Sequence, residues 1–156
     1  MTDQDGDRFT QANLEGKVWV ANFIFTRCTM VCPRVTAETA ALYARSEQAL
    51  PDLEFVSFSV DPAYDTPEVL TRYAADQGAD WTFLTGEADH VENLVMTGFK
   101  VAMQQVPDAP PGGSVLHGSH LVLVDADFNI RGYYDTYSDE AADRLLADAR
   151  VLLRQR

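Results

Sequence analysis

The sequence predicts an α/β fold in which helices cover a mixed β-sheet. Two observations support this prediction. Short apolar runs of strand length alternate with longer segments of helical pattern, and the alternation ends in two strands joined by a short turn. The chain has 156 residues, a length that suits one domain with a substantial hydrophobic core. We therefore expect residues 1–156 to form a single domain.

The first half of the chain predicts two strands, each followed by a helix. Lys17–Phe25 is almost entirely apolar, as expected of a central strand that is covered on both faces. After a turn over Thr26–Met30, a helix is expected over Pro33–Leu50, because proline suits a first helical turn. Leu53–Val60 alternates between apolar and polar residues, which indicates a strand. Pro67–Gln77 predicts the second helix, and the glycine that follows it ends that helix.

The second half predicts shorter elements. A strand is expected over Trp81–Leu84, a helix over Asp89–Thr97, and extended chain over Phe99–Met103. Pro107–Gly113 is rich in proline and glycine, which predicts a loop.

The chain is expected to close with a hairpin and a helix. Strands over His120–Val124 and Ile130–Tyr134 flank the turn Asp125–Asn129. A helix over Ser138–Arg154 follows, with acidic residues near its start and basic residues near its end, as the helix dipole favours. A βαβ unit followed by a hairpin and a closing helix is the plan of thioredoxin, so we expect a thioredoxin-like fold.

The charge of the chain excludes some classes of partner. Acidic residues outnumber basic residues, 24 to 12, and the formal net charge is −12. Nucleic-acid phosphates and anionic membrane surfaces both attract basic residues, so neither is an expected partner. Such a charge keeps a protein soluble, suits a high-salt habitat, or attracts a cationic partner. The sequence has no apolar run of about 18 residues, so it predicts no membrane span.

Cys28 and Cys32 are the only two cysteines, and their spacing indicates a redox or metal-binding pair. A bridge between residues this close closes almost no loop, so it would stabilise the fold little. The pair lies where a buried strand turns into a helix, and the helix start favours thiolates. Arg27, next to the pair, could add to this effect. Three intervening residues leave room for a metal ion as well as for a disulfide.

A third ligand would extend the metal chemistry of the pair. Two thiolates hold a cuprous ion, and an imidazole would let the site accept Cu(II) as well. His117 is the candidate, because it follows the Pro/Gly-rich loop and precedes a strand. We interpret His90 as a cap or surface residue and His120 as a half-exposed strand residue. Met30 is a weaker candidate, since methionine is more often core filler. Structural zinc would need four closed ligands, which one cysteine pair does not supply.

Several blocks of this sequence together resemble the Sco/SenC family, in order and along nearly the whole chain. The block around the cysteines resembles that family's copper motif, and the block around the loop histidine resembles the one that carries its histidine ligand. The matching blocks are Leu14–Lys17, Thr26–Pro33, Ser59–Pro62, Asp65–Glu68, Gly98–Val101 and His117–Asp125.

This resemblance implies a thioredoxin-like fold with an extra β-hairpin, and a site for Cu(I) or Cu(II) formed by Cys28, Cys32 and His117. It implies a metallochaperone, rather than an enzyme, that assists assembly of the CuA centre of cytochrome c oxidase as a metal donor, a thiol reductant or both. The partner is then the CuA-bearing subunit or another copper chaperone. The implied location is periplasmic or otherwise extracytoplasmic, with membrane attachment only through a removed N-terminal anchor. We expect a monomer.

Two positions near the expected site bear on its chemistry. Many family members carry Asp just before the histidine, whereas this sequence has Leu116, so a carboxylate that could orient the imidazole is missing there. Asp61 lies at a strand end that points toward the cysteines in this fold, where it could support a ligand or handle a proton. Its alternative role is to cap the turn before Pro62.

Other functions remain open on the same residues. A thiol-disulfide oxidoreductase without metal would use Cys28 as the nucleophile and Cys32 as the resolving thiol. The metallochaperone and the oxidoreductase can coexist in one protein. A peroxidase or redox sensor is a third reading, but nothing in the sequence would activate peroxide specifically.

Overall fold

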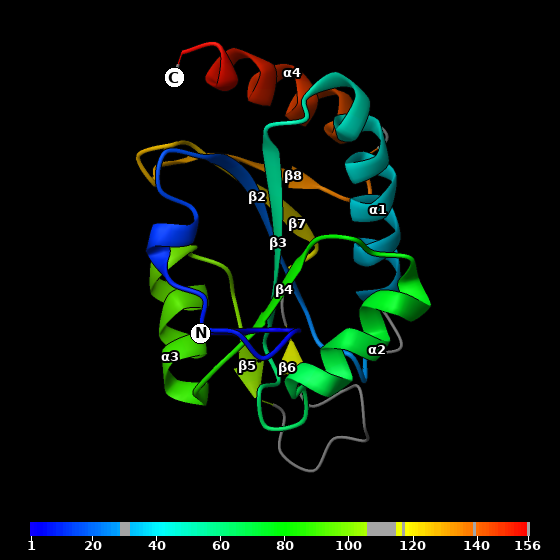
Figure 1. Ribbon diagram of the computed structural model, residues 1–156, viewed down its shortest axis with the longest axis vertical. Coiled ribbons are helices and arrows are strands. Elements are labelled where there is room, and N and C mark those ends of the chain that lie inside the picture. The colour runs from blue at the N-terminus through cyan, green and yellow to red at the C-terminus, as the bar shows by residue number, and fades with distance from the viewer. Residues whose placement is uncertain (29–31, 106–114, 117, 139, 156) are drawn as a thin grey trace.

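A six-stranded β-sheet forms the centre of the protein (Figure 1). The computed structural model describes residues 1–28, 32–105, 115–116, 118–138 and 140–155 of the 156-residue chain. The strands follow the order β1-β4-β3-β2-β7-β8 across the sheet. Their bounds are Thr2–Asp3 (β1), Val18–Ile24 (β2), Leu53–Ser59 (β3), Thr82–Thr85 (β4), His120–Val124 (β7) and Ile130–Asp135 (β8).

The sheet is mixed, as the sequence predicts. β2, β3 and β4 pair in parallel, while β1, β7 and β8 each run antiparallel to their neighbours. Every residue of β2 is buried, which agrees with a central strand covered on both faces. The carboxyl ends of β2, β3 and β4 meet at one edge, and the chain segments that leave these strands lie there together.

Helices cover both faces of the sheet (Figure 1). α1 joins β2 to β3, and α2 joins β3 to β4. Both connections cross over in the same direction along the sheet, and because such crossovers are right-handed, the two helices lie on the same face. α4 lies beside α1, where Arg45 forms an ion pair of 2.5 Å with Asp143. α3 and η1 lie on the other face. The bounds are Gln11–Asn13 (η1, a 3₁₀ turn), Cys32–Ala49 (α1), Pro67–Gln77 (α2), Ala88–Asn93 (α3), Leu94–Gly98 (η2, a π-helical turn) and Ala141–Leu153 (α4).

Aromatic side chains fill the core on both faces. On the α3 face, the ring of Phe23 packs against Phe58 and Phe99 with centroid distances of 5.9 and 5.1 Å. On the α1 face, Tyr43 packs edge-on against Phe55 at 5.4 Å. This packing fixes β2 and β3, and thereby positions the segments that follow both strands.

The structure corrects three expectations. Phe99–Met103 is not extended throughout, because Phe99 has helical backbone angles and Lys100 adopts a left-handed conformation with φ of 56°. The closing helix begins at Ala141 rather than Ser138, because turns closed by backbone hydrogen bonds precede it. The two-residue strand β1 was not predicted.

A separate two-stranded sheet matches the extra β-hairpin that the family resemblance implies. β5 (Gln104–Gln105) pairs antiparallel with β6 (Val115–Leu116). The predicted loop Pro107–Gly113 lies outside the described residues.

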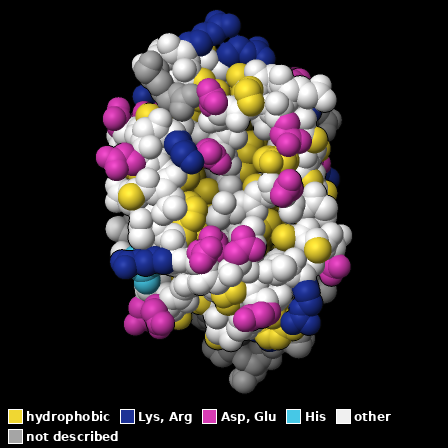
Figure 2. Space-filling view, in the orientation of Figure 1, with side chains coloured by type: hydrophobic (Ala, Val, Ile, Leu, Met, Phe, Trp, Pro, Cys, Tyr) yellow, Lys and Arg dark blue, Asp and Glu magenta, His cyan; other side chains and the backbone are white. Residues whose placement is uncertain are grey.

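The described helices include none that is long and apolar enough to span a bilayer. Acidic side chains are spread over the face drawn in Figure 2, and basic ones are fewer, in line with the net charge of −12.

Candidate metal and thiol site

Cys28 and Cys32 lie together at the carboxyl edge of the sheet. Cys28 ends the turn after β2, where its N–H donates to the Phe25 carbonyl at 3.0 Å. Cys32 begins α1, and its N–H donates to the Cys28 sulfur at 3.4 Å. Both side chains are thiols, 8% and 0% exposed. The structure therefore brings the two predicted site residues into contact, with Cys28 on the more accessible side.

The Cys32 thiol holds its proton firmly. A hydrogen bond with the Cys28 side chain, followed by burial, raises the pKa of Cys32 far above its ordinary value. Both effects oppose the thiolate that the helix start is expected to favour at Cys32. A metal ion that binds both sulfurs must displace this proton.

Asp65 fastens the segment before Cys28 to the end of β3. Its carboxylate is fully buried and accepts hydrogen bonds from the Thr26 N–H at 3.1 Å, the Thr26 hydroxyl at 2.5 Å and the Ser59 hydroxyl at 2.6 Å. Burial raises the pKa of Asp65, although the bonds from Ser59 and Thr26 oppose that rise. Three bonds to one buried group fix the turn that presents Cys28.

Asp61 is coupled to the cysteine segment through Arg27. The Arg27 guanidinium donates to one Asp61 carboxylate oxygen from two nitrogens, at 3.1 and 2.6 Å. It also stacks on the Tyr64 ring, with 4.3 Å to the centroid. The hydrogen bond and the attraction of Asp61 raise the pKa of Arg27. Asp61 thus neutralises the cation that precedes Cys28 in the chain.

Tyr73 is a neighbour of the site that sequence reasoning missed. Its hydroxyl lies 2.7 Å from the hydroxyl of Thr36, one helical turn after Cys32. Burial raises the pKa of Tyr73 to about 12, and the nearby Cys32 and Cys28 add to that rise. Tyr73 belongs to α2 and Thr36 to α1, so their contact depends on how the two helices pack. No pattern of neighbouring residues in the sequence could have predicted it.

His117 lies outside the described residues, between the end of β6 and the start of β7. The residues that follow it are tied to α1. The Ser119 carbonyl accepts bonds from the Thr136 N–H at 3.2 Å and the Thr136 hydroxyl at 2.8 Å. The Thr136 carbonyl in turn accepts two bonds from Arg34, which lies two residues after Cys32. A chain of hydrogen bonds thus links the segment after His117 to the first turn of α1.

Neither His90 nor His120 joins the two cysteines in the part of the chain that the structure describes. His90 is exposed on α3, as expected of a surface residue, and His120 begins strand β7, as predicted. Met30 lies outside the described residues. Within the described ranges, no three His, Cys, Asp or Glu side chains are arranged to hold a metal ion.

Comparison with known proteins identifies relatives of the whole chain. The family model described as SCO1/SenC matches residues 1–153. The chain is 32% identical over 153 residues to the SCO1 protein homolog of Bacillus subtilis (strain 168), and the match covers 95% of this chain and 77% of that protein. The chain spans 43% of the mitochondrial protein SCO2 of Saccharomyces cerevisiae, to which it is 33% identical over 133 residues.

Solved structures share the architecture. A SCO1/SenC family lipoprotein from Bacillus anthracis superposes with a TM-score of 0.87 and 35% identity, over 97% of this chain and 90% of that chain. The structure of BsSco superposes with a TM-score of 0.86 and 31% identity, over 99% of this chain and 91% of that chain. BsSco is described as having a disulfide switch and as a member of the Sco family of cytochrome c oxidase assembly proteins. Copper-bound ScoI of Arabidopsis thaliana superposes with a TM-score of 0.81 and 26% identity, over 99% of this chain and 95% of that chain.

These superpositions confirm the predicted thioredoxin-like fold. Since the family model also matches residues 1–153, the chain belongs to the SCO1/SenC family.

Proposed function

We propose that this chain is a copper metallochaperone that holds one Cu(I) or Cu(II) ion as cargo, with Cys28, Cys32 and His117 as ligands. The observation that carries the proposal is the contact between the two cysteines, in which the Cys32 N–H donates to the Cys28 sulfur at 3.4 Å. Two adjacent thiols are a soft donor pair, which suits a cuprous ion.

The donor set fits copper better than structural zinc. Zinc in structural sites takes four closed protein ligands. The site supplies two thiol sulfurs, those of Cys28 and Cys32. One imidazole from His117 would complete a three-coordinate site and stabilise Cu(II). The link from Arg34 through Thr136 to Ser119 supports this assignment, because it holds the segment after His117 close to α1.

Relatives support the cargo and the destination. Arabidopsis ScoI, which shares the fold and 26% of the sequence, binds copper. BsSco belongs to a family of cytochrome c oxidase assembly proteins. We therefore infer delivery of copper to the CuA-bearing subunit of the oxidase, or exchange with another copper chaperone. The lipoprotein relative from B. anthracis supports an extracytoplasmic, membrane-tethered location.

Metal titration tests the proposal. The reduced protein is titrated anaerobically with Cu(I) and separately with Cu(II), and bound metal and absorption spectra are measured. The expected result is one tightly held copper per chain and a thiolate-to-Cu(II) charge-transfer band. Cys28→Ser and Cys32→Ser should each abolish tight binding, whereas Ser46→Ala, a change of a buried residue on α1 away from the thiols, should leave it intact. Tight binding that survives both cysteine substitutions would refute the site.

The same two sulfurs support a second candidate function, a thiol-disulfide oxidoreductase. The Cys28 thiolate would attack a partner disulfide and form a mixed disulfide, with one partner thiolate leaving. Cys32 would then attack the Cys28 sulfur, releasing the second partner thiol and forming a Cys28–Cys32 disulfide. The partner gains two electrons and this chain loses two. Cys28 is 8% exposed and Cys32 is 0% exposed, which favours this order of attack. The disulfide switch described for the relative BsSco supports a redox role of the pair.

Turnover in the presence of a strict copper chelator separates the two functions. Reduction of a disulfide substrate that continues at the same rate supports the oxidoreductase. Loss of activity on chelation contradicts it and leaves the metallochaperone.

A further inference from the structure

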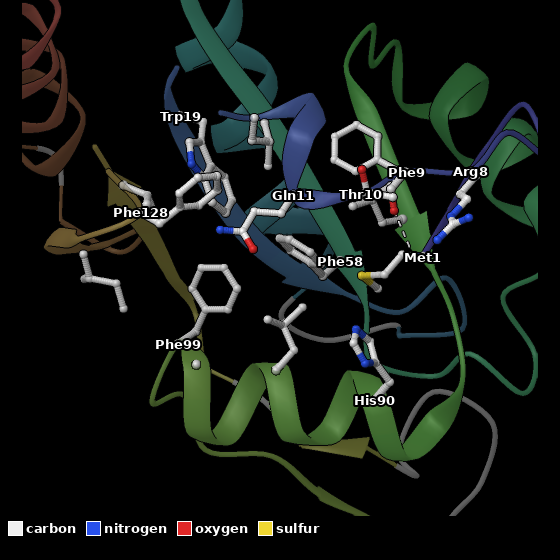
Figure 3. Close-up of a pocket in the computed structure, with 16 residues that line it drawn as sticks. Met1, Arg8, Phe9, Thr10, Gln11, Trp19, Phe58, His90, Phe99 and Phe128 are labelled. Atoms are coloured by element: carbon white, nitrogen blue, oxygen red, sulfur yellow. Dashed lines mark hydrogen bonds between the residues drawn. The ribbon is translucent and has the colours of Figure 1, made fainter. Parts of the chain in front are cut away.

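A cavity of about 550 Å³ lies on the α3 face of the sheet, apart from the cysteines (Figure 3). Sixteen residues line it, drawn from the N-terminal segment, the sheet, α3, η2 and the β7–β8 turn, and neither cysteine is among them. Small-molecule sites commonly have volumes of about 300–1,000 Å³. The cavity is thus large enough for a ligand that the copper function does not use.

One end of the cavity is aromatic. The Trp19 ring lies 6.3, 5.9 and 6.5 Å from the rings of Phe58, Phe99 and Phe128. Figure 3 shows Trp19, Phe128 and Phe99 at one end and Phe58 nearer the middle, with the side chain of Gln11 between them. Such walls favour an apolar ligand body over water.

The other end carries basic side chains. Figure 3 places Arg8 and His90 away from Trp19 and Phe128. Among the described residues, Arg8 has no carboxylate or other hydrogen-bond partner for its guanidinium, and His90 has none for its imidazole. No lining residue is acidic, although acidic residues outnumber basic ones 24 to 12 in the chain. The charge at this end therefore complements an anion.

We propose that this cavity binds an amphipathic carboxylate of the size of a medium-chain fatty acid. The apolar tail lies among the rings of Trp19, Phe58, Phe99 and Phe128, and the carboxylate lies at Arg8. The planar guanidinium presents paired N–H donors that match the two oxygens of a carboxylate. His90 adds a further donor at the same end. The site is independent of the copper proposal, because the cavity contains neither cysteine.

The two tryptophans provide a reporter and its internal control. Trp19 is 4% exposed, and its indole N–H has no acceptor among the described residues, so an entering ligand that moves the rings around it should shift its resonance. Trp81 donates its indole N–H to the Ser57 hydroxyl at 2.8 Å and does not line the cavity. Its resonance should stay fixed.

The experiment titrates the metal-free protein, labelled with nitrogen-15, with sodium dodecanoate below its critical micelle concentration. We expect a saturable shift of the Trp19 indole resonance and none for Trp81. Undecyltrimethylammonium, which has the same alkyl tail as dodecanoate and the opposite charge, should bind at least about tenfold more weakly. Gln11→Trp, which fills the cavity from the exposed η1, should prevent dodecanoate binding.

A paired variant tests the charged end. R8Q/H90Q changes two exposed residues and should weaken dodecanoate binding about tenfold. R150Q/R154Q changes two exposed positions at the end of α4, outside the cavity, and should not alter the affinity. The absence of a saturable Trp19 shift, equal binding of the ammonium amphiphile, or unchanged affinity in R8Q/H90Q would each overturn the proposal.

Discussion

Arg34 donates hydrogen bonds from Nε and Nη2 to the backbone carbonyl of Thr136, at 3.3 and 3.2 Å. The two residues are 102 positions apart, and their contact joins the first turn of α1 to the end of β8. Arg34 also stacks on the exposed ring of Tyr137 at 4.5 Å. This contact connects α1, which begins with Cys32, to the strand pair β7–β8, and β7 begins three residues after His117.

Substitution of Arg34 should weaken Cu(II) binding without a comparable effect on Cu(I). Arg34→Gln removes the bonds to Thr136, so the segment after His117 loses its anchor to α1. Loss of such supporting contacts typically costs about 10–100-fold in metal affinity. We expect a loss of about tenfold for Cu(II), measured by competition with a chelator of known affinity.

Matched variants sharpen this prediction. Thr136→Val removes the hydroxyl bond to Ser119 and should act in the same direction. Arg45→Gln changes another arginine of α1, one that pairs with exposed Asp143, and should leave Cu(II) affinity unchanged. Equal Cu(II) affinities in all three variants and the unaltered protein would show that the anchor does not position His117.

Release of Arg27 from its carboxylate partner should activate Cys28. Asp61→Asn keeps the shape of the side chain but removes the charge that neutralises Arg27. An uncompensated cation beside Cys28 favours its thiolate. We expect alkylation of Cys28 by iodoacetamide at pH 7 to accelerate about two- to fivefold, as quantified by peptide mass spectrometry.

The double variant R27Q/D61N provides the control, because it removes both charges and should restore the original alkylation rate. A D61N variant that reacts no faster than the unaltered protein would contradict electrostatic coupling between Asp61 and Cys28.

Loss of Asp65 should destabilise the fold around the site. Asp65→Ala leaves the Thr26 N–H, the Thr26 hydroxyl and the Ser59 hydroxyl without their buried acceptor. The expected decrease in the free energy of unfolding is about 2–4 kcal/mol, measured by urea denaturation. Asp76→Ala removes an exposed carboxylate of α2 and should cost much less. Similar losses in both variants would contradict the role assigned to Asp65.

Asp125 should make the hairpin sensitive to acid. Burial opposes its ionisation, but hydrogen bonds from Asn129, Asp127 and Arg131 outweigh burial and lower the pKa of Asp125 below 3.8. A lowered pKa means that the stabilisation is complete above the unfolded value of about 3.8 and is lost as the pH falls through the folded value. Asp125→Asn should cost about 1 kcal/mol at pH 7 and progressively less toward pH 3.

Urea unfolding at several pH values measures this difference. Asp127→Asn removes a charge from the same turn at an exposed position and should show no such trend. A difference between the unaltered protein and Asp125→Asn that stays constant from pH 7 to pH 3 would refute the assignment.

Much of the fold could be predicted because its signals are local. α2 occupies the predicted range, since Thr66 caps it by accepting from the Val69 N–H and Gly78 ends it with φ of 63°. β2 is recognisable from its nearly continuous apolar run, which only Asn22 interrupts. The extended chain predicted over Phe99–Met103 was wrong, because lysine rarely adopts the left-handed conformation seen at Lys100 and the sequence carries no signal for it.

The site could be predicted only in part. The spacing of Cys28 and Cys32 marks them at once, whereas the contact from Tyr73 to Thr36 and the anchor from Arg34 depend on tertiary packing. Pairings between residues far apart in the chain leave no periodic or spacing signal in a single sequence.

X-ray absorption spectroscopy at the copper edge tests the proposed ligand set most directly. The copper-loaded protein and its His117→Ala variant are compared in both oxidation states. We expect two sulfur scatterers and one imidazole nitrogen in the unaltered protein, with the sulfurs retained and the imidazole lost in the variant. A spectrum without sulfur ligands, or an imidazole signal that persists in His117→Ala, would contradict the assignment of Cys28, Cys32 and His117 as the copper ligands.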